Sequence, residues 1–244
     1  MTLNIKNKNL FYIILISFLI VSPKWIYSII QFHNEDFLLK SLYLTSDFYY
    51  YPLISNISEL DLSPLYLDIE INKLGLLSFP ILNLGLISIF FKIFGHYAFL
   101  ILEFICIIFV LIIFDTLFKY LKFSKNLSLT YSLILLSTPF LFQSLNYLNF
   151  PFTEKIILNY STFYDLRFPR PIITNLFLFY FIFISVKIYN YNDYNKNNYL
   201  ITGILSGLSL HLFFYFFIIQ NIFFTFLHII KFKKNILKFL FEKK

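Results

Sequence analysis

One segment places a carboxylate among tyrosines, residue types that can do chemistry just above a membrane. Residues 45–52 contain Asp47, Tyr49, Tyr50 and Tyr51, and they follow the first apolar run of the chain. A carboxylate held there can act as a general base on an acceptor hydroxyl or amine, or bind a metal that does so. The same residues also fit an interfacial aromatic belt with a solvated aspartate. Both interpretations stay open, with Asp47 as the candidate base and Tyr50 and Tyr51 as candidate substrate contacts.

The two arginines of the chain lie close together, at Arg167 and Arg170, shortly after Asp165, and every other Lys or Arg position holds lysine. A guanidinium binds a phosphate through two hydrogen bonds in a planar fork, which an ammonium cannot do. Such a pair could hold the phosphate of a lipid-linked donor and stabilise the charge of the leaving phosphate. The alternative is that the arginines anchor the next helix on phospholipid headgroups, with Asp165 paired to Arg167.

Glu103 is expected to be the one carboxylate well inside a membrane span. Because an ionised group in lipid is costly, such a residue is by default a candidate functional group. It either lines a cavity beneath the external loops or pairs with Lys92 or His96 near the membrane interface. The sequence favours the pairing.

A metal site has only weak support in the sequence. Asp68 and Glu70 share one face of an extended segment, as ligands of a divalent cation would. The single cysteine, Cys106, lies in an apolar run and has no metal-type spacing to histidine. The cofactor therefore stays unknown, with a divalent cation as an open expectation and no metal ligands assigned.

The composition makes lipid the solvent of this chain. Of its 244 residues, 59% are hydrophobic and 14% are charged, and the mean hydropathy is +0.73. A soluble domain with this composition would expose large apolar patches. The net charge of +7 comes from lysines in short loops and near the C-terminus, where the cytoplasmic preference of basic residues accounts for them. We therefore predict an all-α polytopic membrane helix bundle that contacts membrane lipid and binds no nucleic acid.

The predicted bundle has about six transmembrane helices and one interfacial juxtamembrane helix. Four spans are predicted at 10–30, 97–118, 127–147 and 171–188. The stretch 199–230 is too long for a single crossing of a core of about 30 Å, so it is expected to break near 213–217 into a tight hairpin. Residues 76–94 contain Pro80, Asn83, Gly85 and Lys92, and they are expected to lie in the membrane interface.

Charge placement predicts the orientation. Lysines precede the first span, whereas 33–73 is acidic, so the N-terminus should be cytoplasmic. If 76–94 does not cross, all later basic clusters also fall on the cytoplasmic side, and 33–96 and 148–170 share the external face. The prediction is one integral membrane domain, 1–244, in the cell membrane with both termini cytoplasmic and the first span retained as an anchor.

The order of these features resembles the N-terminal module of GT-C-fold glycosyltransferases, polytopic enzymes that use polyprenyl-phosphate-linked sugars and include aminoarabinose and protein-mannosyl transferases. The resemblance covers roughly residues 10–230. It begins with one span and an external loop with an early aspartate. A Pro-containing helix from Phe79-Pro80 to Phe94-Gly95 follows, and then a span that ends in basic residues. Its last components are Ser137-Thr138-Pro139 and the glycine pair Gly203 and Gly207.

The resemblance implies a function and roles for particular residues. Asp47 would take the catalytic-base position, and Asp165 would be a candidate second carboxylate. The chain lacks the Lys-Pro-Pro motif of the family, and Lys73 and Pro80 are its nearest counterparts. The implied activity is transfer of a sugar from a polyprenyl-phosphate carrier at the extracytoplasmic face. The alternatives are a transporter or flippase component for lipid-linked saccharides, and a non-catalytic membrane subunit.

Overall fold

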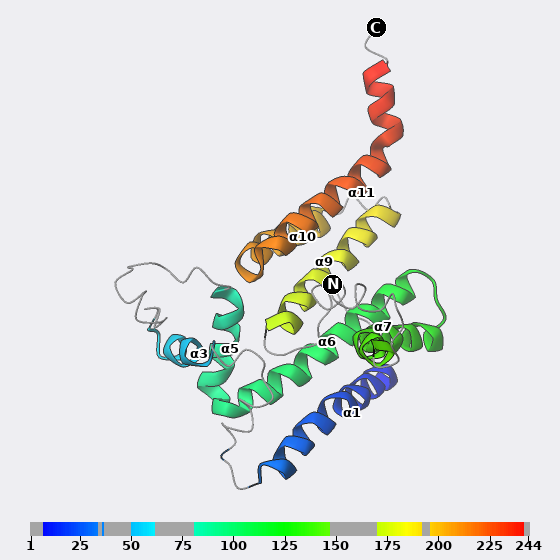
Figure 1. Cartoon of the computed structure of the whole chain (residues 1–244). Coiled ribbons are helices and arrows are strands. Elements are labelled where there is room, and N and C mark those ends of the chain that lie inside the picture. Colours follow the sequence, from blue (N-terminus) through cyan, green and yellow to red (C-terminus); the bar gives the residue numbers. More distant parts are fainter. Residues whose placement is uncertain are drawn as a thin grey trace. The chain divides into compact units, whose positions relative to one another are not determined.

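Every regular element in the described part of the chain is helical, which confirms the all-α prediction (Figure 1). This computed structural model describes residues 7–33, 36, 50–61, 81–146, 170–191 and 196–241. The chain divides into two compact units, residues 1–176 and 177–244, with the boundary inside a helix. Each unit is described by itself.

Unit 1 is built around one long helix, α6 (Ala98–Tyr120), which packs against α1 (Asn7–Gln31), α5 (Ile81–Phe94) and α7 (Lys125–Asn146). α6 buries side chains on all its faces, as expected of a central helix. α1 instead buries a single stripe, Ile13, Ser17, Val21, Trp25 and Ser28. This spacing of three or four residues selects one helical face, and most of the other apolar side chains of α1 are exposed, as lipid contact requires.

A sharp bend separates α5 from α6. The connection is one turn of 3₁₀ helix, η2 (Gly95–Tyr97), and Gly95 has a φ of +57°. Glycine fits this position because a Cβ disfavours the left-handed region. α5 has 14 residues, fewer than the roughly 20 residues that a span requires. Its length is about 21 Å at 1.5 Å per residue.

Three stretches in the described ranges are long and apolar enough to cross a membrane: Leu10–Gln31, Ile81–Tyr120 and Ile172–Tyr189. The first and last match the predicted spans 10–30 and 171–188. The middle stretch contains the bend at Gly95, and its second part, α6, matches the predicted span 97–118. The predicted span 127–147 forms helix α7.

Unit 2 contains the predicted hairpin. It comprises most of α9 (Arg170–Tyr191) with α10 (Lys196–Leu212) and α11 (Phe214–Phe241). The helix break falls at Phe213, inside the predicted window of 213–217. α10 and α11 pack together, and Ser209 Oγ donates to Gln220 Oε1 at 2.7 Å while Asn221 Nδ2 donates to Ser206 Oγ at 2.9 Å. These bonds cross between the helices beside the break and hold the hairpin closed.

Candidate functional site

The amino-terminal end of α6 holds an aromatic cluster formed by Tyr51, Phe91, His96 and Phe99. Tyr51 begins α3 (Tyr51–Ser58), which packs on α5 through the buried side chains of that short helix. The Tyr51 ring stacks on His96 and Phe99 and meets Phe91 edge to face. Such ring pairs are worth about 0.5–1.5 kcal/mol each beyond their buried area. The cluster therefore fixes the start of α3 against the bend between α5 and α6.

The Tyr51 hydroxyl forms a hydrogen bond with His96 Nδ1. Burial disfavours the phenolate and raises the pKa of Tyr51 from 10.0 to about 12. The hydroxyl consequently keeps its proton at neutral pH and can donate it to the imidazole. This hydrogen bond joins the start of α3 to the bend after α5, and the role of Tyr51 as a substrate contact stays a prediction.

α5 also contacts the start of α9. Asn83 Nδ2, near the beginning of α5, donates to Thr174 Oγ1, near the beginning of α9, at 3.0 Å, and both residues are buried. The other end of α5 runs through η2 into the start of α6. α5 thus joins the first turns of two apolar helices, and its placement in the membrane interface stays a prediction.

Glu103 has a different partner from the one predicted. Its carboxylate accepts a hydrogen bond from Lys24 Nζ at 2.6 Å and one from Trp25 Nε1 at 2.7 Å. The prediction of Lys92 or His96 as partner is therefore wrong. Sequence separation hid this pair, because only the packing of α1 on α6 brings the two segments to the same level.

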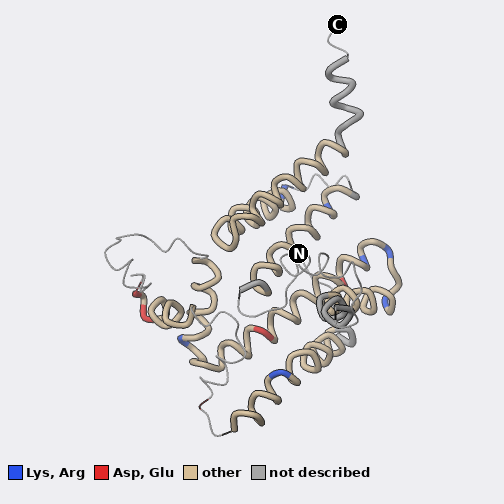
Figure 2. Tube along the Cα trace, viewed as in Figure 1, with Lys and Arg blue, Asp and Glu red and all other residues tan. Residues whose placement is uncertain are grey.

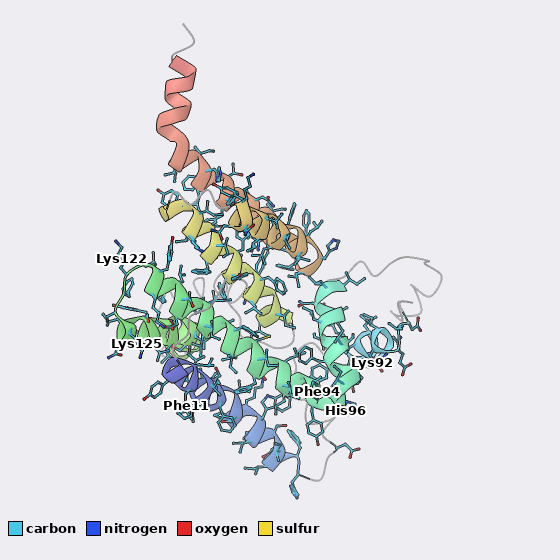
Figure 3. All side chains as sticks on the ribbon, turned by 180° about the vertical axis from the view of Figure 1, so that it is seen from behind. Phe11, Lys92, Phe94, His96, Lys122 and Lys125 are labelled. Carbon is cyan, nitrogen blue, oxygen red and sulfur yellow. The ribbon has the colours of Figure 1, made fainter. Side chains whose placement is uncertain are left out.

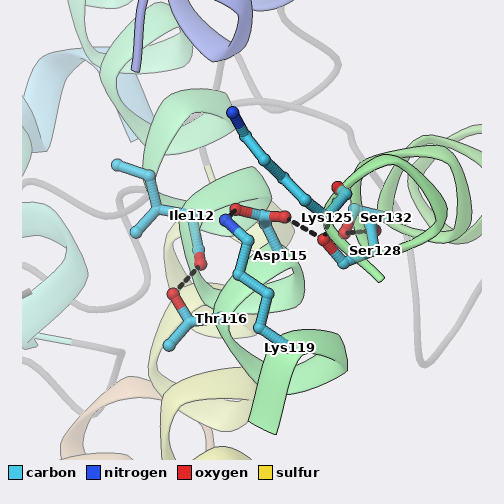
Figure 4. A network of polar contacts seen from close by, with 7 residues as sticks. All are labelled: Ile112, Asp115, Thr116, Lys119, Lys125, Ser128 and Ser132. Carbon is cyan, nitrogen blue, oxygen red and sulfur yellow. Dashed lines mark hydrogen bonds and ion pairs between the residues drawn. The ribbon is translucent and has the colours of Figure 1, made fainter. Parts of the chain in front are cut away.

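A second buried carboxylate lies at the other end of α6 (Figure 4). Asp115 is 3% exposed; it accepts hydrogen bonds from Lys119 Nζ and, at 2.6 Å, from Ser128 Oγ of α7. Glu103 is therefore not the one carboxylate well inside a span, as the sequence suggested. The signal was present, because Asp115 and Lys119 are four residues apart and so lie on one helical face.

These two ends of unit 1 carry different charged groups. Figure 3 shows Lys92 and His96 at one end, and Phe11, Lys122 and Lys125 at the other. In Figure 2 the turn between α6 and α7 is marked by lysines, whereas acidic residues follow α3 at the opposite end. Lys92 is basic as well, so the two ends differ in their acidic residues, and the prediction that 33–96 and 119–126 face opposite sides of the membrane stays a prediction.

Most predicted site residues lie outside the described ranges. These are Asp47, Lys73, Asp165 and Arg167. Tyr50 occupies the N-cap position of α3 without a side-chain capping hydrogen bond, and the backbone of Arg170 begins α9. Within the described residues no three His, Cys, Asp or Glu side chains gather as a metal site would require, and Asp68 and Glu70 fall outside that part of the chain.

Comparison with known proteins found no likeness: no family model, no curated protein and no solved structure matches this chain.

Proposed function

We propose that this protein is a membrane glycosyltransferase of the GT-C type that transfers a sugar from a polyprenyl-phosphate carrier at the extracytoplasmic face. The observation that supports it most is the attachment of two chain segments to α5. One segment ends in Tyr51, four residues after Asp47, and is tied to Phe91 and His96. The other begins with Arg170 and is tied by Thr174 to Asn83.

The two attachment points lie on the same helix. Asn83 and Phe91 are eight residues apart on α5, about 12 Å along the helix axis. The described residues that follow the candidate base in sequence, and those that follow the candidate phosphate-binding arginines, therefore both contact α5. This shared contact supports the proposal that the two segments serve one substrate.

The proposed reaction assigns a task to each segment. Asp47 takes the proton of the acceptor hydroxyl or amine, and the acceptor atom attacks the anomeric carbon of the donor sugar. The bond from that carbon to the phosphate oxygen breaks, and the polyprenyl phosphate leaves with the bonding electrons. Arg167 and Arg170 stabilise its charge through bidentate hydrogen bonds, with Asp165 and Lys73 as further candidates beside them.

The proposal includes a topology of six spans with both termini cytoplasmic. The spans are α1, α6, α7, α9, α10 and the apolar part of α11, and α5 lies in the external interface. The exposed side chains of α5 include Ile89, Ile93 and Lys92, a combination suited to the boundary between acyl chains and headgroups. The acidic loop and the arginine segment are then on the same external face.

The decisive experiment compares Asp47→Asn with a control, Asp36→Asn, in an exposed residue of the same predicted external loop. Proteoliposomes would be supplied with a panel of labelled polyprenyl-phosphate sugars and washed membrane acceptors, and release of polyprenyl phosphate would be measured. We expect turnover to fall about 10²- to 10⁴-fold in Asp47→Asn and to be unchanged in Asp36→Asn, with equal thermal stability.

Two outcomes would overturn the proposal. Turnover in Asp47→Asn equal to that of wild type would show that Asp47 is not the catalytic base. Movement of the intact donor across the vesicle membrane by the wild type, without cleavage of the sugar–phosphate bond, would favour the transporter alternative.

A further inference from the structure

The turn between α6 and α7 presents lysines and apolar side chains on one exposed surface. Lys122 and Lys125 are exposed, and neither forms an ion pair with another described residue. Four large apolar or aromatic side chains around the lysines are also exposed: Leu121 (42%), Phe123 (39%), Leu127 (49%) and Tyr131 (42%). Lys119 differs, because Asp115 already neutralises its ammonium. We call Leu121, Lys122, Phe123, Lys125, Leu127 and Tyr131 the turn patch.

The turn patch is held in place by a well-defined helix ending. Phe123 N donates to Phe118 O at 3.1 Å and Lys122 N to Lys119 O at 3.0 Å, the two hydrogen bonds of a Schellman motif. The Phe118 and Phe123 rings meet at 5.6 Å, and both contact Tyr131. The backbone that carries the lysines is therefore ordered before a ligand binds, and the entropy lost on binding is mainly that of the lysine side chains.

Lys122 occupies a backbone position that suits glycine better. Its φ is +67°, in the left-handed region where a Cβ is unfavourable and where Schellman motifs usually place glycine. Membrane topology requires positive charge in this turn but does not require it at the left-handed residue. Lys122 is thus one of two non-glycine residues with a positive φ in the described part of the chain.

From these features we propose that the turn patch binds the headgroup of an anionic phospholipid in the adjacent leaflet. The patch begins directly after Tyr120, where the apolar stretch ends, so it lies at headgroup depth when α6 spans the membrane. The two ammonium groups complement a lipid phosphate, and the exposed apolar side chains contact the glycerol and upper acyl region. A soluble anion would leave those side chains in water, so the lipid is the better match.

The proposed lipid site lies at the end of unit 1 opposite to Lys92 and His96 (Figure 3). In Figure 4 no dashed line joins the Lys125 ammonium to Asp115, and no ion pair of Lys125 with a described residue is present, which leaves its ammonium available. This binding site is independent of any sugar transfer, because it involves none of the residues assigned to that reaction.

The test measures phosphatidylglycerol binding by native mass spectrometry of protein released from nanodiscs of mixed phosphatidylglycerol and phosphatidylcholine. The variants are Lys122→Gly, Lys125→Gln and the control Lys92→Gln, an exposed lysine at the other end of unit 1. We expect each turn-patch variant to lose about fivefold in preference for phosphatidylglycerol. Lys92→Gln should retain the wild-type preference.

Lys122→Gly separates binding from folding. Glycine relieves the left-handed backbone, so this variant should have a thermal midpoint equal to or above that of wild type while it loses lipid. An unchanged preference in both Lys122→Gly and Lys125→Gln would overturn the proposal. An equal loss in Lys92→Gln would also overturn it, because it would show a response to net charge alone.

Discussion

At the scale of single residues, the pairing of Lys24 with Glu103 explains how an ionisable group is tolerated inside an apolar helix. Glu103 is 6% exposed, and its two oxygens each accept a hydrogen bond from α1. A buried charge without such partners would be costly. The side chain of Lys24 is 35% exposed, so the pair is only partly removed from polar surroundings and its net contribution is smaller than that of a fully buried pair.

A double-mutant cycle measures this pair. Lys24→Met and Glu103→Gln should each lower the free energy of unfolding by about 2 kcal/mol, less than for a fully buried pair because Lys24 is partly exposed. The double variant should lose less than the sum, with a coupling of about 1 kcal/mol. SDS-induced unfolding in mixed micelles gives the free energies, and Lys92→Met serves as an exposed control. Additive effects of the two substitutions on the free energy of unfolding would show that Lys24 and Glu103 do not interact.

At the scale of elements, the bend at Gly95 decides where α5 goes. Without it, α5 and α6 would continue as one helix and α3 would lose its packing surface. Nothing lies within 4 Å of a Cβ built on Gly95, so the requirement for glycine comes from its backbone conformation and not from crowding. Gly85 in α5 likewise has open space around it but no positive φ, and it makes a matched control.

The two glycines should respond in opposite ways to alanine. Gly95→Ala should destabilise the protein by about 1 kcal/mol, because alanine is disfavoured in the left-handed region. Gly85→Ala should be neutral or stabilise by about 0.5–1 kcal/mol, because alanine is the better residue inside a helix. Thermal unfolding in one detergent measures both. A Gly95→Ala protein as stable as Gly85→Ala would show that the bend is not strained by a side chain.

At the scale of the whole molecule, the proposed topology can be tested at the two ends of unit 1. α3 and the bend lie at one end of α6, and the lysine-rich turn lies at the other. We therefore predict that Leu60 and Lys125 lie on opposite sides of the membrane. Leu60 is 81% exposed and Lys125 is exposed, so both positions are suitable for labelling.

Cysteine accessibility tests this topology. In a Cys106→Ala background, Leu60→Cys should react with an impermeant maleimide from outside sealed cells, and Lys125→Cys should react only after permeabilisation. Labelling of the two positions from the same side would show that α5 crosses the membrane, and the arrangement of six spans would have to be rebuilt.

Local properties of the chain sufficed to predict much of this protein. Composition determined the all-helical membrane class, because only helices and closed barrels satisfy backbone groups in lipid. The interruptions at Pro80, Asn83 and Gly85 predict that 76–94 differs from a span, and this stays a prediction. The excessive length of 199–230 predicted the break, which falls at Phe213. Each of these inferences depends on residues that are neighbours in sequence.

Tertiary structure decided which distant side chains meet. Lys24 and Glu103 are 79 residues apart in sequence, and their pairing depends on the depth and rotation of α1 against α6. Likewise, only packing reveals that Tyr51 contacts His96, that Asn83 contacts Thr174 and that Asp115 accepts from Ser128. Hydrophobic periodicity determines which face of a helix is buried, but many helix pairs satisfy that periodicity equally well. Partner choice in an apolar bundle therefore rests on polar contacts that become defined only once the helices are packed.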